Sequence, residues 1–401
     1  MDIQLYDWLT FFMRWLHVIT AIAWIGASFY FIWLDLSLEP PRPEQAAKGF
    51  SGELWAIHGG GIYEVGKYRL NPEQMPARLH WFKWEAYSTW LTGSALLVLV
   101  YYLRAQTNLV GPDSALSAPA TAITASVAYL AIGLGYYELV MRSAIGAKVS
   151  RQVIALVGLV IIASWVAFEL FAARAAIIHV GALLATLMAA NVFLSIIPSQ
   201  KAFVGAIDAG LAPDPKLGQM AKERSTHNNY LTLPVVFCML ANHAPFVFGH
   251  PHAWLLVVAI AAVAALARHF FNLKHRGNLR PGLLVAASCG FAAIIVAAAL
   301  TDARSQRTPA SQATDSVRTE AESEAKIAQL VLEHCAQCHS AEPSFAAYTT
   351  PPGGYLFTTP AALQAQAELV GRSLQTNYMP LGNLNGLTAA ERALLIEWVS
   401  D

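Results

Sequence analysis

The sequence predicts an all-α protein with two parts: an eight-span transmembrane helix bundle and a small all-α domain outside the membrane. Of the 401 residues, 56% are hydrophobic and only 13% are charged, against about 25% charged in ordinary soluble domains. Charge-poor stretches recur along the first 300 residues, and the composition becomes polar after Leu300. Basic and acidic residues balance at 26 each, so the charge gives no sign of a nucleic-acid partner.

Eight stretches nearly free of charge can cross a hydrocarbon core of about 30 Å, the two shortest with help from flanking aromatic residues. Backbone groups in lipid must be satisfied within the segment, so each stretch is expected to be a helix. The predicted spans are 9–34, 87–102, 122–140, 153–171, 175–197, 231–248, 253–267 and 282–300.

The loop charges predict the orientation of the bundle. The loops after spans one, three, five and seven carry seventeen lysines and arginines, whereas the other loops carry only Arg104 and Arg174. The positive-inside rule places the four basic loops in the cytoplasm. We therefore expect a multi-pass protein of the bacterial inner membrane whose N-terminus and C-terminal domain are periplasmic.

Composition divides the chain into three parts. Residues 1–301 form the membrane domain, and residues 302–325, rich in Ser, Thr and Ala, are predicted to be a linker. Residues 326–401 are amphipathic and too polar to span a membrane. They are expected to form a compact periplasmic domain.

The string Cys335-Ala336-Gln337-Cys338-His339 has the C-x-x-C-H spacing of covalent haem c attachment. Two thiols one turn apart can reach both vinyl groups of one porphyrin, and His339 then lies under the iron. A chance match or half of a zinc site is the alternative. A helical run precedes the motif, Met379 follows about forty residues later, and a closing amphipathic helix is expected over 387–399. His339 and Met379 would be the two iron ligands of one haem c, which predicts a class I cytochrome c domain.

Histidines inside spans are hypotheses for functional sites. His17, His179 and His243 all fall in the outer third of the predicted bundle. Imidazole ligands on facing helices can hold a haem b, so one or two haem b groups are expected, the second on the inner side. The alternative is that each histidine is a hydrogen-bonded interior residue.

The loop after the first predicted span contains a basic side chain beside aromatic side chains. A triple glycine that would allow close approach of a ligand follows His58, and the string His80-Trp81-Phe82-Lys83-Trp84-Glu85 comes later. On a helix, His80 and Lys83 would share a face with Trp84. This combination suits a planar anion, and an interfacial aromatic belt is the alternative.

A third polar cluster opens the sixth predicted span. His227, Asn228 and Asn229 could bind the amide edges of a purine-like ring. They could equally cap the helix.

Together these strings resemble the bacterial membrane-bound urate oxidases, in which a multi-span urate oxidase N-terminal domain precedes a cytochrome c. The resemblance rests on the following strings: Trp15-Leu16-His17 with Ala23-Trp24-Ile25-Gly26, His58-Gly59-Gly60-Gly61, Leu79-His80-Trp81-Phe82-Lys83-Trp84-Glu85, His227-Asn228-Asn229-Tyr230 through Asn242-His243, and the haem c motif. It implies oxidation of urate to 5-hydroxyisourate without peroxide. The electrons would pass through haem to a soluble cytochrome c or a terminal oxidase.

The resemblance also suggests roles for the polar residues. His80, Lys83 and Glu85 would be catalytic, and the substrate-binding residues would be His58, Trp84, His227 and Asn228. A quinol-to-cytochrome relay without urate chemistry is the main alternative, and it leaves the cationic, aromatic loop unexplained. A transporter with an attached redox sensor is a third reading, but no broken-helix signal in paired halves supports it.

Overall fold

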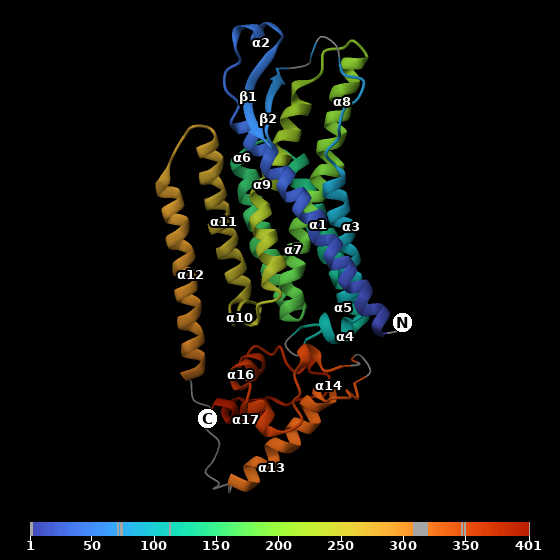
Figure 1. Ribbon diagram of the computed structural model, residues 1–401, viewed down its shortest axis with the longest axis vertical. Helices are drawn as coiled ribbons and strands as arrows, with labels where there is room; N and C mark the ends of the chain where they lie inside the picture. Colours follow the sequence, from blue (N-terminus) through green and yellow to red (C-terminus); the bar gives the residue numbers. More distant parts are fainter. Residues whose placement is uncertain are drawn as a thin grey trace.

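The computed structural model describes residues 3–69, 72, 75–111, 114–307, 320–345, 348 and 350–400. Long helices pack side by side into an elongated bundle, with a β-hairpin at one end and a small helical domain at the other (Figure 1). The helices of the bundle are α1 (Ile3–Leu36), α3 (Trp84–Leu96), α5 (Pro119–Arg142), α6 (Val149–Leu170), α7 (Ala173–Ala190), α8 (Ile197–Asp208), α9 (Pro215–Ala241), α11 (Ala253–His275) and α12 (Pro281–Arg307).

Six helices have the length and apolar composition needed to cross a membrane, and each contains most or all of one predicted span. They are Leu5–Leu36, Pro119–Arg142, Val149–Leu170, Ala173–Asp208, Ala253–His275 and Pro281–Thr301. Their apolar side chains face both the bundle interior and its outer surface, as expected of helices surrounded by lipid. The membrane character predicted for this part of the chain is therefore supported by helix length and composition.

The other two predicted spans lie in less regular helices. Residues 87–102 belong to α3 and to the π-helix η1 (Leu97–Tyr102) that continues it. The predicted span 231–248 ends early, because α9 stops at Ala241 and a separate short helix, α10 (Pro245–Phe248), follows. The first half of α9 is polar, with Lys222, Glu223 and Arg224 in succession, so this helix lacks the hydropathy of the other six.

Two continuous helical runs are longer than a bilayer core. At 1.5 Å per residue, the 34 residues of α1 extend about 51 Å. The run of 36 residues from α7 through the π-helix η2 (Asn191–Ile196) to α8 extends about 54 Å. Since the hydrocarbon core is about 30 Å thick, these helices continue past it. Figure 1 shows α8 reaching toward the hairpin end of the bundle.

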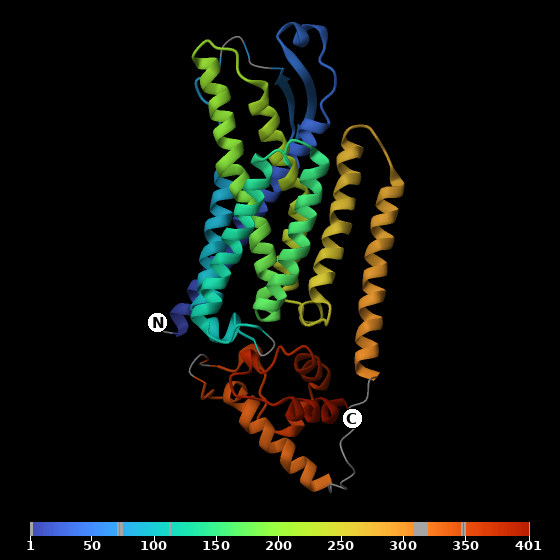
Figure 2. The same ribbon diagram turned by 180° about the vertical axis from the view of Figure 1, so that it is seen from behind.

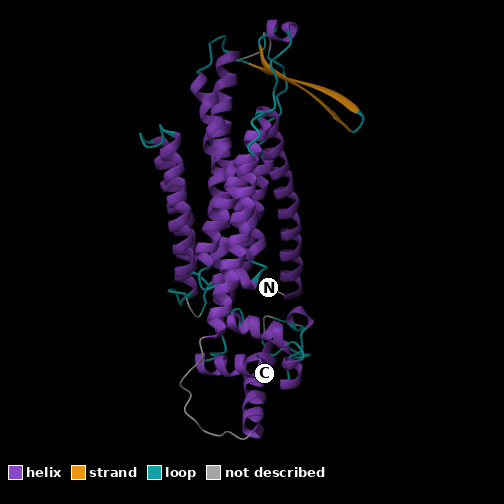
Figure 3. Cartoon of the chain, turned by 90° about the vertical axis from the view of Figure 1, so that its left-hand side faces the viewer, coloured by secondary structure: helices purple, strands orange, loops and turns teal. Residues whose placement is uncertain are grey.

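A β-hairpin in the first loop corrects the all-α prediction. Strands β1 (Phe50–His58) and β2 (Gly61–Tyr68) pair antiparallel, after the short helix α2 (Pro43–Ala47). Gly59 and Gly60 form the turn with φ of 59° and 80°, values that a two-residue hairpin turn requires and that glycine adopts freely. The hairpin turn therefore explains why glycines follow His58 in the sequence. Figure 3 shows the hairpin projecting away from the bundle.

The C-terminal part forms a separate small helical domain. Its elements are α13 (Glu320–Leu330), the π-helix η3 (Val331–Cys335), α14 (Ala336–His339), the 3-10 turn η4 (Pro352–Gly354), α15 (Pro360–Gln364), α16 (Ala367–Gln375), the 3-10 turn η5 (Leu381–Asn383) and α17 (Ala389–Ser400). Ile327, Leu330, Leu363 and Leu395 are fully buried in its own apolar core. Helices α12 and α13 extend into the predicted linker from both sides, and its middle, 308–319, lies outside the described residues.

The small domain packs against the end of the bundle at which α1 begins (Figures 1 and 2). The short helix α4 (Ala105–Asn108) and α10 form the contact surface. The rings of Phe248 and Tyr378 meet edge to face at 5.6 Å between centroids. At Gly382, a Cβ atom would lie 2.9 Å from the carbonyl oxygen of Gln106, so only glycine allows this approach. The start of α1 and the small domain therefore lie at the same end of the bundle (Figure 1).

Candidate functional site

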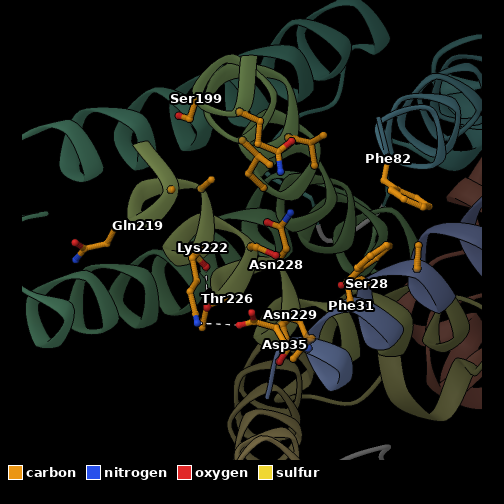
Figure 4. A pocket seen from close by; sticks show the side chains of 18 of the residues that line it. Ser28, Phe31, Asp35, Phe82, Ser199, Gln219, Lys222, Thr226, Asn228 and Asn229 are labelled. Atoms are coloured by element: carbon orange, nitrogen blue, oxygen red, sulfur yellow. Dashed lines mark hydrogen bonds and ion pairs between the residues drawn. The ribbon is translucent and has the colours of Figure 1, made fainter. Parts of the chain in front are cut away.

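A cavity of about 900 Å³ lies at the hairpin end of the bundle. Helices α1, α8, α9 and α11, strand β2 and the segment that leads into α3 all contribute to its wall. Figure 4 shows Phe31 and Asp35 of α1 and Lys222, Asn228 and Asn229 of α9 gathered around it. The aromatic rings of Trp24, Trp81 and Phe82 also line the cavity. Flat rings and hydrogen-bonding groups around one space can bind a planar polar ligand.

Two lysines share one carboxylate in the cavity wall. Asp35 pairs with Lys67 of β2 through Oδ1 and with Lys222 of α9 through Oδ2, the latter at 2.8 Å. All three side chains line the cavity. These ion pairs attach the hairpin to α1 and α9, so the hairpin is part of the cavity wall.

Of the seven residues to which the resemblance assigns catalytic or substrate-binding roles, His80, Glu85 and Asn228 line this cavity, and Asn229 of the third polar cluster lines it as well. Glu85 lies in the first turn of α3, and its Oε2 is buried with no hydrogen-bond partner among the described residues. The His80 ring contacts Phe82 edge to face, with centroids 4.4 Å apart. Asn228 is already paired, because its Oδ1 accepts from Asn191 and its Nδ2 donates to the Met188 carbonyl. Glu85 therefore offers a buried acceptor atom, whereas the amide of Asn228 is already paired.

The other predicted urate-site residues lie outside the cavity wall. Helix α3 begins at Trp84, so His80 and Lys83 precede it and do not share a helix face with Trp84 as predicted. The Lys83 ammonium lies 5.7 Å from the Trp84 ring centroid, and the Trp84 side chain is exposed. His58 lies at the exposed end of β1, beside the hairpin turn. The positions of His58, Lys83 and Trp84 agree with an interfacial belt of aromatic and basic side chains as well as they agree with a ligand-binding site.

His227 belongs to a polar network inside the bundle. Its Nδ1 is 2.8 Å from the Tyr137 hydroxyl, and its Nε2 is 3.1 Å from the Gln152 side-chain oxygen. Asn191 donates to the same Tyr137 hydroxyl at 3.0 Å. Arg224 donates to Asn191 and binds Glu138 with both terminal nitrogens, at 2.9 and 3.3 Å. This network links α5, α6, η2 and α9, and it occupies both ring nitrogens of His227, which is not among the residues that line the cavity.

A second cavity, of about 350 Å³, lies in the small domain and contains all four predicted haem c residues. Cys335, Cys338, His339 and Met379 line it together with apolar side chains such as Leu374. The motif residues come from η3 and α14, whereas Met379 comes from the segment after α16. Met379 is held by its backbone, since its carbonyl accepts from Arg392 at 2.6 Å. A pair of thiols, an imidazole and a thioether around an apolar space fit a covalently attached haem c.

Burial affects the imidazole and the thiols of this cavity in different ways. Burial lowers the pKa of His339, so its imidazole is neutral at pH 7, the form that binds a metal. The ring's Nδ1 lies 3.0 Å from the Tyr355 carbonyl, which leaves Nε2 for iron. Burial raises the pKa of the Cys335 thiol to about 11 and raises that of Cys338 as well. Both cysteines are free thiols in this structure.

The three histidines predicted to hold haem b lie on different elements. His17 of α1 contacts the Thr92 hydroxyl at 3.0 Å through Nδ1. His179 of α7 is fully buried and stacks on Phe171, and both of its ring nitrogens have partners: the Ala175 carbonyl and the Ser126 hydroxyl. His243 lies just after α9 and is exposed. A haem iron at His179 would have to replace Ser126 at Nε2. Within the described part of the chain, no three or more His, Cys, Asp or Glu side chains are arranged so that together they could hold a metal ion.

Several cavity residues were not predicted from the sequence as site residues. Asp35 ends a long apolar helix, and Asn272 follows Arg268 by one turn on α11. The seventh predicted span ends at residue 267, whereas α11 continues to His275 and so includes Arg268 and Asn272. The i, i+4 spacing of two strongly polar residues at the end of an apolar helix was the available signal.

The chain was compared with protein families, curated proteins and solved structures. The urate oxidase N-terminal family matches residues 3–299. The curated proteins and the solved structures gave no match. The matched range includes the whole helical bundle with its hairpin and its cavity, and it stops before the small domain. The chain belongs to the urate oxidase N-terminal family.

Proposed function

We propose that this protein is a membrane-bound urate oxidase that converts urate to 5-hydroxyisourate and releases the electrons through a haem c in its small domain. The observation that carries the proposal is one chain with two cavities. One cavity lies in the domain that matches the urate oxidase family, and the other is lined by Cys335, Cys338, His339 and Met379. Six candidate membrane spans support a location in the lipid bilayer.

The reaction balances without peroxide. Urate and one water give 5-hydroxyisourate, two protons and two electrons, with a new bond between C5 of urate and the water oxygen. Haem c, when bound, accepts one electron at a time and so supplies the redox chemistry that the side chains lack. A soluble cytochrome c or a terminal oxidase would be the next acceptor.

The hairpin-end cavity is the proposed urate site. Trp24, Trp81 and Phe82 offer flat surfaces for a bicyclic ring. Glu85 carries a buried carboxylate oxygen that has no hydrogen-bond partner among the described residues, which suits a group that takes a proton from urate or from the attacking water. His80 lines the same wall and would orient the substrate.

The topology is part of the proposal. We propose eight spans, with α3 and η1 as the second and α9 as the sixth, in the bacterial inner membrane. The N-terminus and the small domain would lie in the periplasm. The loop charges and the position of the small domain beside the start of α1 support this arrangement (Figure 1). Urate would then bind near the cytoplasmic face.

Haem b remains a proposal, with one or two groups held by His17, His179 or His243. We propose it because the two cavities are far apart. One is lined by residues at the hairpin end of the bundle and the other by residues of the small domain, and the bundle between them would cross about 30 Å of hydrocarbon. A pyridine haemochrome spectrum tests it, because that spectrum counts b and c haems separately. A spectrum with c-type haem alone would remove the histidine relay.

The central experiment mixes oxidised, haem-loaded protein with urate under anaerobic conditions. We expect prompt haem reduction, two reduced haem equivalents for each urate consumed, and ¹⁸O from labelled water in the product. Haem reduction by quinol but not by urate would support the quinol-to-cytochrome relay instead. Peroxide formation in place of haem reduction would also contradict the proposal.

A further inference from the structure

A buried polar cluster connects α9 and α11 at the wall of the large cavity. The Asn229 side-chain oxygen accepts hydrogen bonds from Arg268 Nε at 3.0 Å and from Asn272 Nδ2 at 2.9 Å. The three residues are 0%, 6% and 7% exposed, respectively. Their mutual bonds fix the orientation of each side chain, so the remaining polar atoms have defined directions.

Each member of this cluster keeps one polar atom unpaired. Arg268 Nη2, Asn229 Nδ2 and Asn272 Oδ1 are buried and have no hydrogen-bond partner within the described part of the chain. Buried polar atoms in folded proteins nearly always have a partner, and exceptions need an explanation. Asn229 and Asn272 line the cavity, so a ligand there can reach this cluster.

The charge of Arg268 points to an anion. Its guanidinium lies 4.0 Å from the Phe29 ring centroid, its Nε donates to Asn229, and its Nη2 has no hydrogen-bond partner among the described residues. A buried arginine at the end of a membrane helix normally has a counter-ion or a functional partner. A bound anion would supply this partner.

We propose that Arg268, Asn229 and Asn272 recognise the imide edge of an anionic purine, and that this edge belongs to urate. The cluster offers two donors and one acceptor. An imide offers the complement, a ring N–H between two carbonyl oxygens, and urate carries this pattern at N1 with O2 and O6. The inference rests on the proposed function and assigns the substrate-recognition groups of the same cavity.

The acceptor atom Asn272 Oδ1 argues against a phosphate group as the ligand of this cluster. An ionised phosphodiester presents only oxygen acceptors, so it would leave Asn272 Oδ1 unpaired, and inorganic phosphate, which keeps a P–OH donor, lacks the donor between two acceptors that the cluster would pair. A heterocycle with an N–H between carbonyls pairs all three atoms. Specificity of this kind comes from buried groups that the wrong ligand leaves without partners.

The test is equilibrium binding to the full-length, haem-loaded protein in detergent. Trp24 and Trp81 line the cavity, so bound ligand should quench tryptophan fluorescence. The probes are urate, 1-methylurate, in which the imide N–H is replaced by N–CH₃, and inorganic phosphate. We expect 1-methylurate to bind about tenfold more weakly than urate, the loss of one good hydrogen bond, and phosphate not to compete.

Substitutions test whether Asn272 and Arg268 bind the imide edge of the ligand. Asn272→Leu should weaken urate binding about tenfold and leave 1-methylurate binding nearly unchanged, so that the two ligands bind alike. Arg268→Gln should weaken both ligands, and Arg268→Lys should recover part of the loss because it keeps the charge. Asn278→Leu is the matched control, an exposed asparagine six residues further along the chain, and it should bind as the wild type does.

The outcomes separate this inference from the proposed function. If Asn272→Leu binds urate as tightly as the wild type, or 1-methylurate binds the wild type as tightly as urate, the inference is wrong even where urate reduces haem. If urate binds with the expected dependence on Asn272 but never reduces haem, the recognition site stands and the oxidase proposal fails. Competition by phosphate would assign the cluster to a simple anion and overturn the inference.

Discussion

The two cavities of this protein are built in different ways. The cavity at the hairpin end is assembled from several helices, strand β2 and the segment before α3, all far apart in the sequence, and its wall carries charges and amides such as Asp35, Lys222 and Asn228. The cavity in the small domain is lined mostly by residues between 334 and 395, and its wall is largely apolar around Cys335 and Cys338. The first can select a ligand by hydrogen bonds and charge, whereas the second can hold one by covalent attachment.

This contrast predicts how each site fails. A site that depends on hydrogen bonds and charge should lose function gradually, as single polar groups are removed. A site that depends on two thiols should lose its ligand completely when they are removed, without any effect on the distant cavity. Substitutions in the two regions therefore test the comparison directly.

The largest effect is expected from Cys335→Ser combined with Cys338→Ser. Without the thiols no thioether can form, so covalent haem should be absent and urate should no longer reduce an added acceptor. Haem staining after denaturing electrophoresis measures the first effect, and tryptophan quenching by urate should remain as in the wild type. Cys289→Ser is the control, since Cys289 is an exposed, isolated cysteine. Loss of urate binding in the double variant would contradict the separation of the two sites.

Substitution of Glu85 by Gln should give the next largest effect. It keeps the shape of the side chain and removes the carboxylate that is proposed to take a proton. Loss of a general base costs about 10² to 10⁴ in rate, so kcat should fall by this factor while the affinity for urate changes little. Stopped-flow haem reduction under anaerobic conditions measures it. Glu44→Gln, an exposed glutamate on α2, should react as the wild type does, and an equal rate for Glu85→Gln would exclude Glu85 as the base.

The same contrast explains what the sequence could predict. The predicted haem c residues Cys335, Cys338 and His339 are close together in the chain, and their spacing alone predicts the chemistry. In the structure Met379 lines the same cavity as these three residues. Six apolar spans were also predictable, because membrane helices must be long and apolar.

The hairpin-end site was less predictable because tertiary contacts determine it. The glycines after His58 form a hairpin turn, which cannot be distinguished from a ligand-binding loop by composition. The start of α3 at Trp84 removes the helix face expected for His80 and Lys83. The cluster around Asn229 depends on where α9 meets α11, and one sequence without pairing information gives no such contact.

Breaking a buried ion pair should lower stability more than breaking an exposed one. Glu138 and Arg224, behind the large cavity, are 14% and 6% exposed. Removal of one partner of a buried pair costs about 3–5 kcal/mol, and Arg224→Met should fall near the lower end because Arg142 still pairs with Glu138. Unfolding of the protein in detergent with increasing denaturant measures the change.

The matched control lies in the small domain. Arg372 and Glu368 pair on the surface of α16, with side chains 53% and 89% exposed, and such pairs contribute about 0–1 kcal/mol. Arg372→Met should therefore be nearly neutral. Adding Glu138→Leu to Arg224→Met should recover much of the loss, because no unpaired buried charge then remains. Equal costs for the buried and exposed pairs would contradict this part of the comparison.

The smallest effect is expected from an exposed charge at the start of α17. Thr388 and Glu391 cap each other: the Thr388 backbone N–H and hydroxyl donate to Glu391 Oε2 at 3.0 and 2.8 Å, and the Glu391 N–H donates to the Thr388 hydroxyl. These hydrogen bonds, with that from the Thr388 backbone as the largest cause, lower the pKa of Glu391 from 4.5.

A carboxyl group with a lowered pKa in the folded state stabilises that state when it is ionised. The contribution is therefore present above about pH 4.5 and is lost as the pH falls through the lowered pKa of the folded protein. Hydrogen exchange of the α17 amides should be compared between wild type and Glu391→Gln at each pH. We expect faster exchange in the variant at pH 6. The difference should disappear as the pH falls below 4.5. Glu397→Gln, on an exposed position of the same helix, is the control. A difference that persists unchanged at lower pH would mean that the cap depends on the side chain's shape and not on its charge.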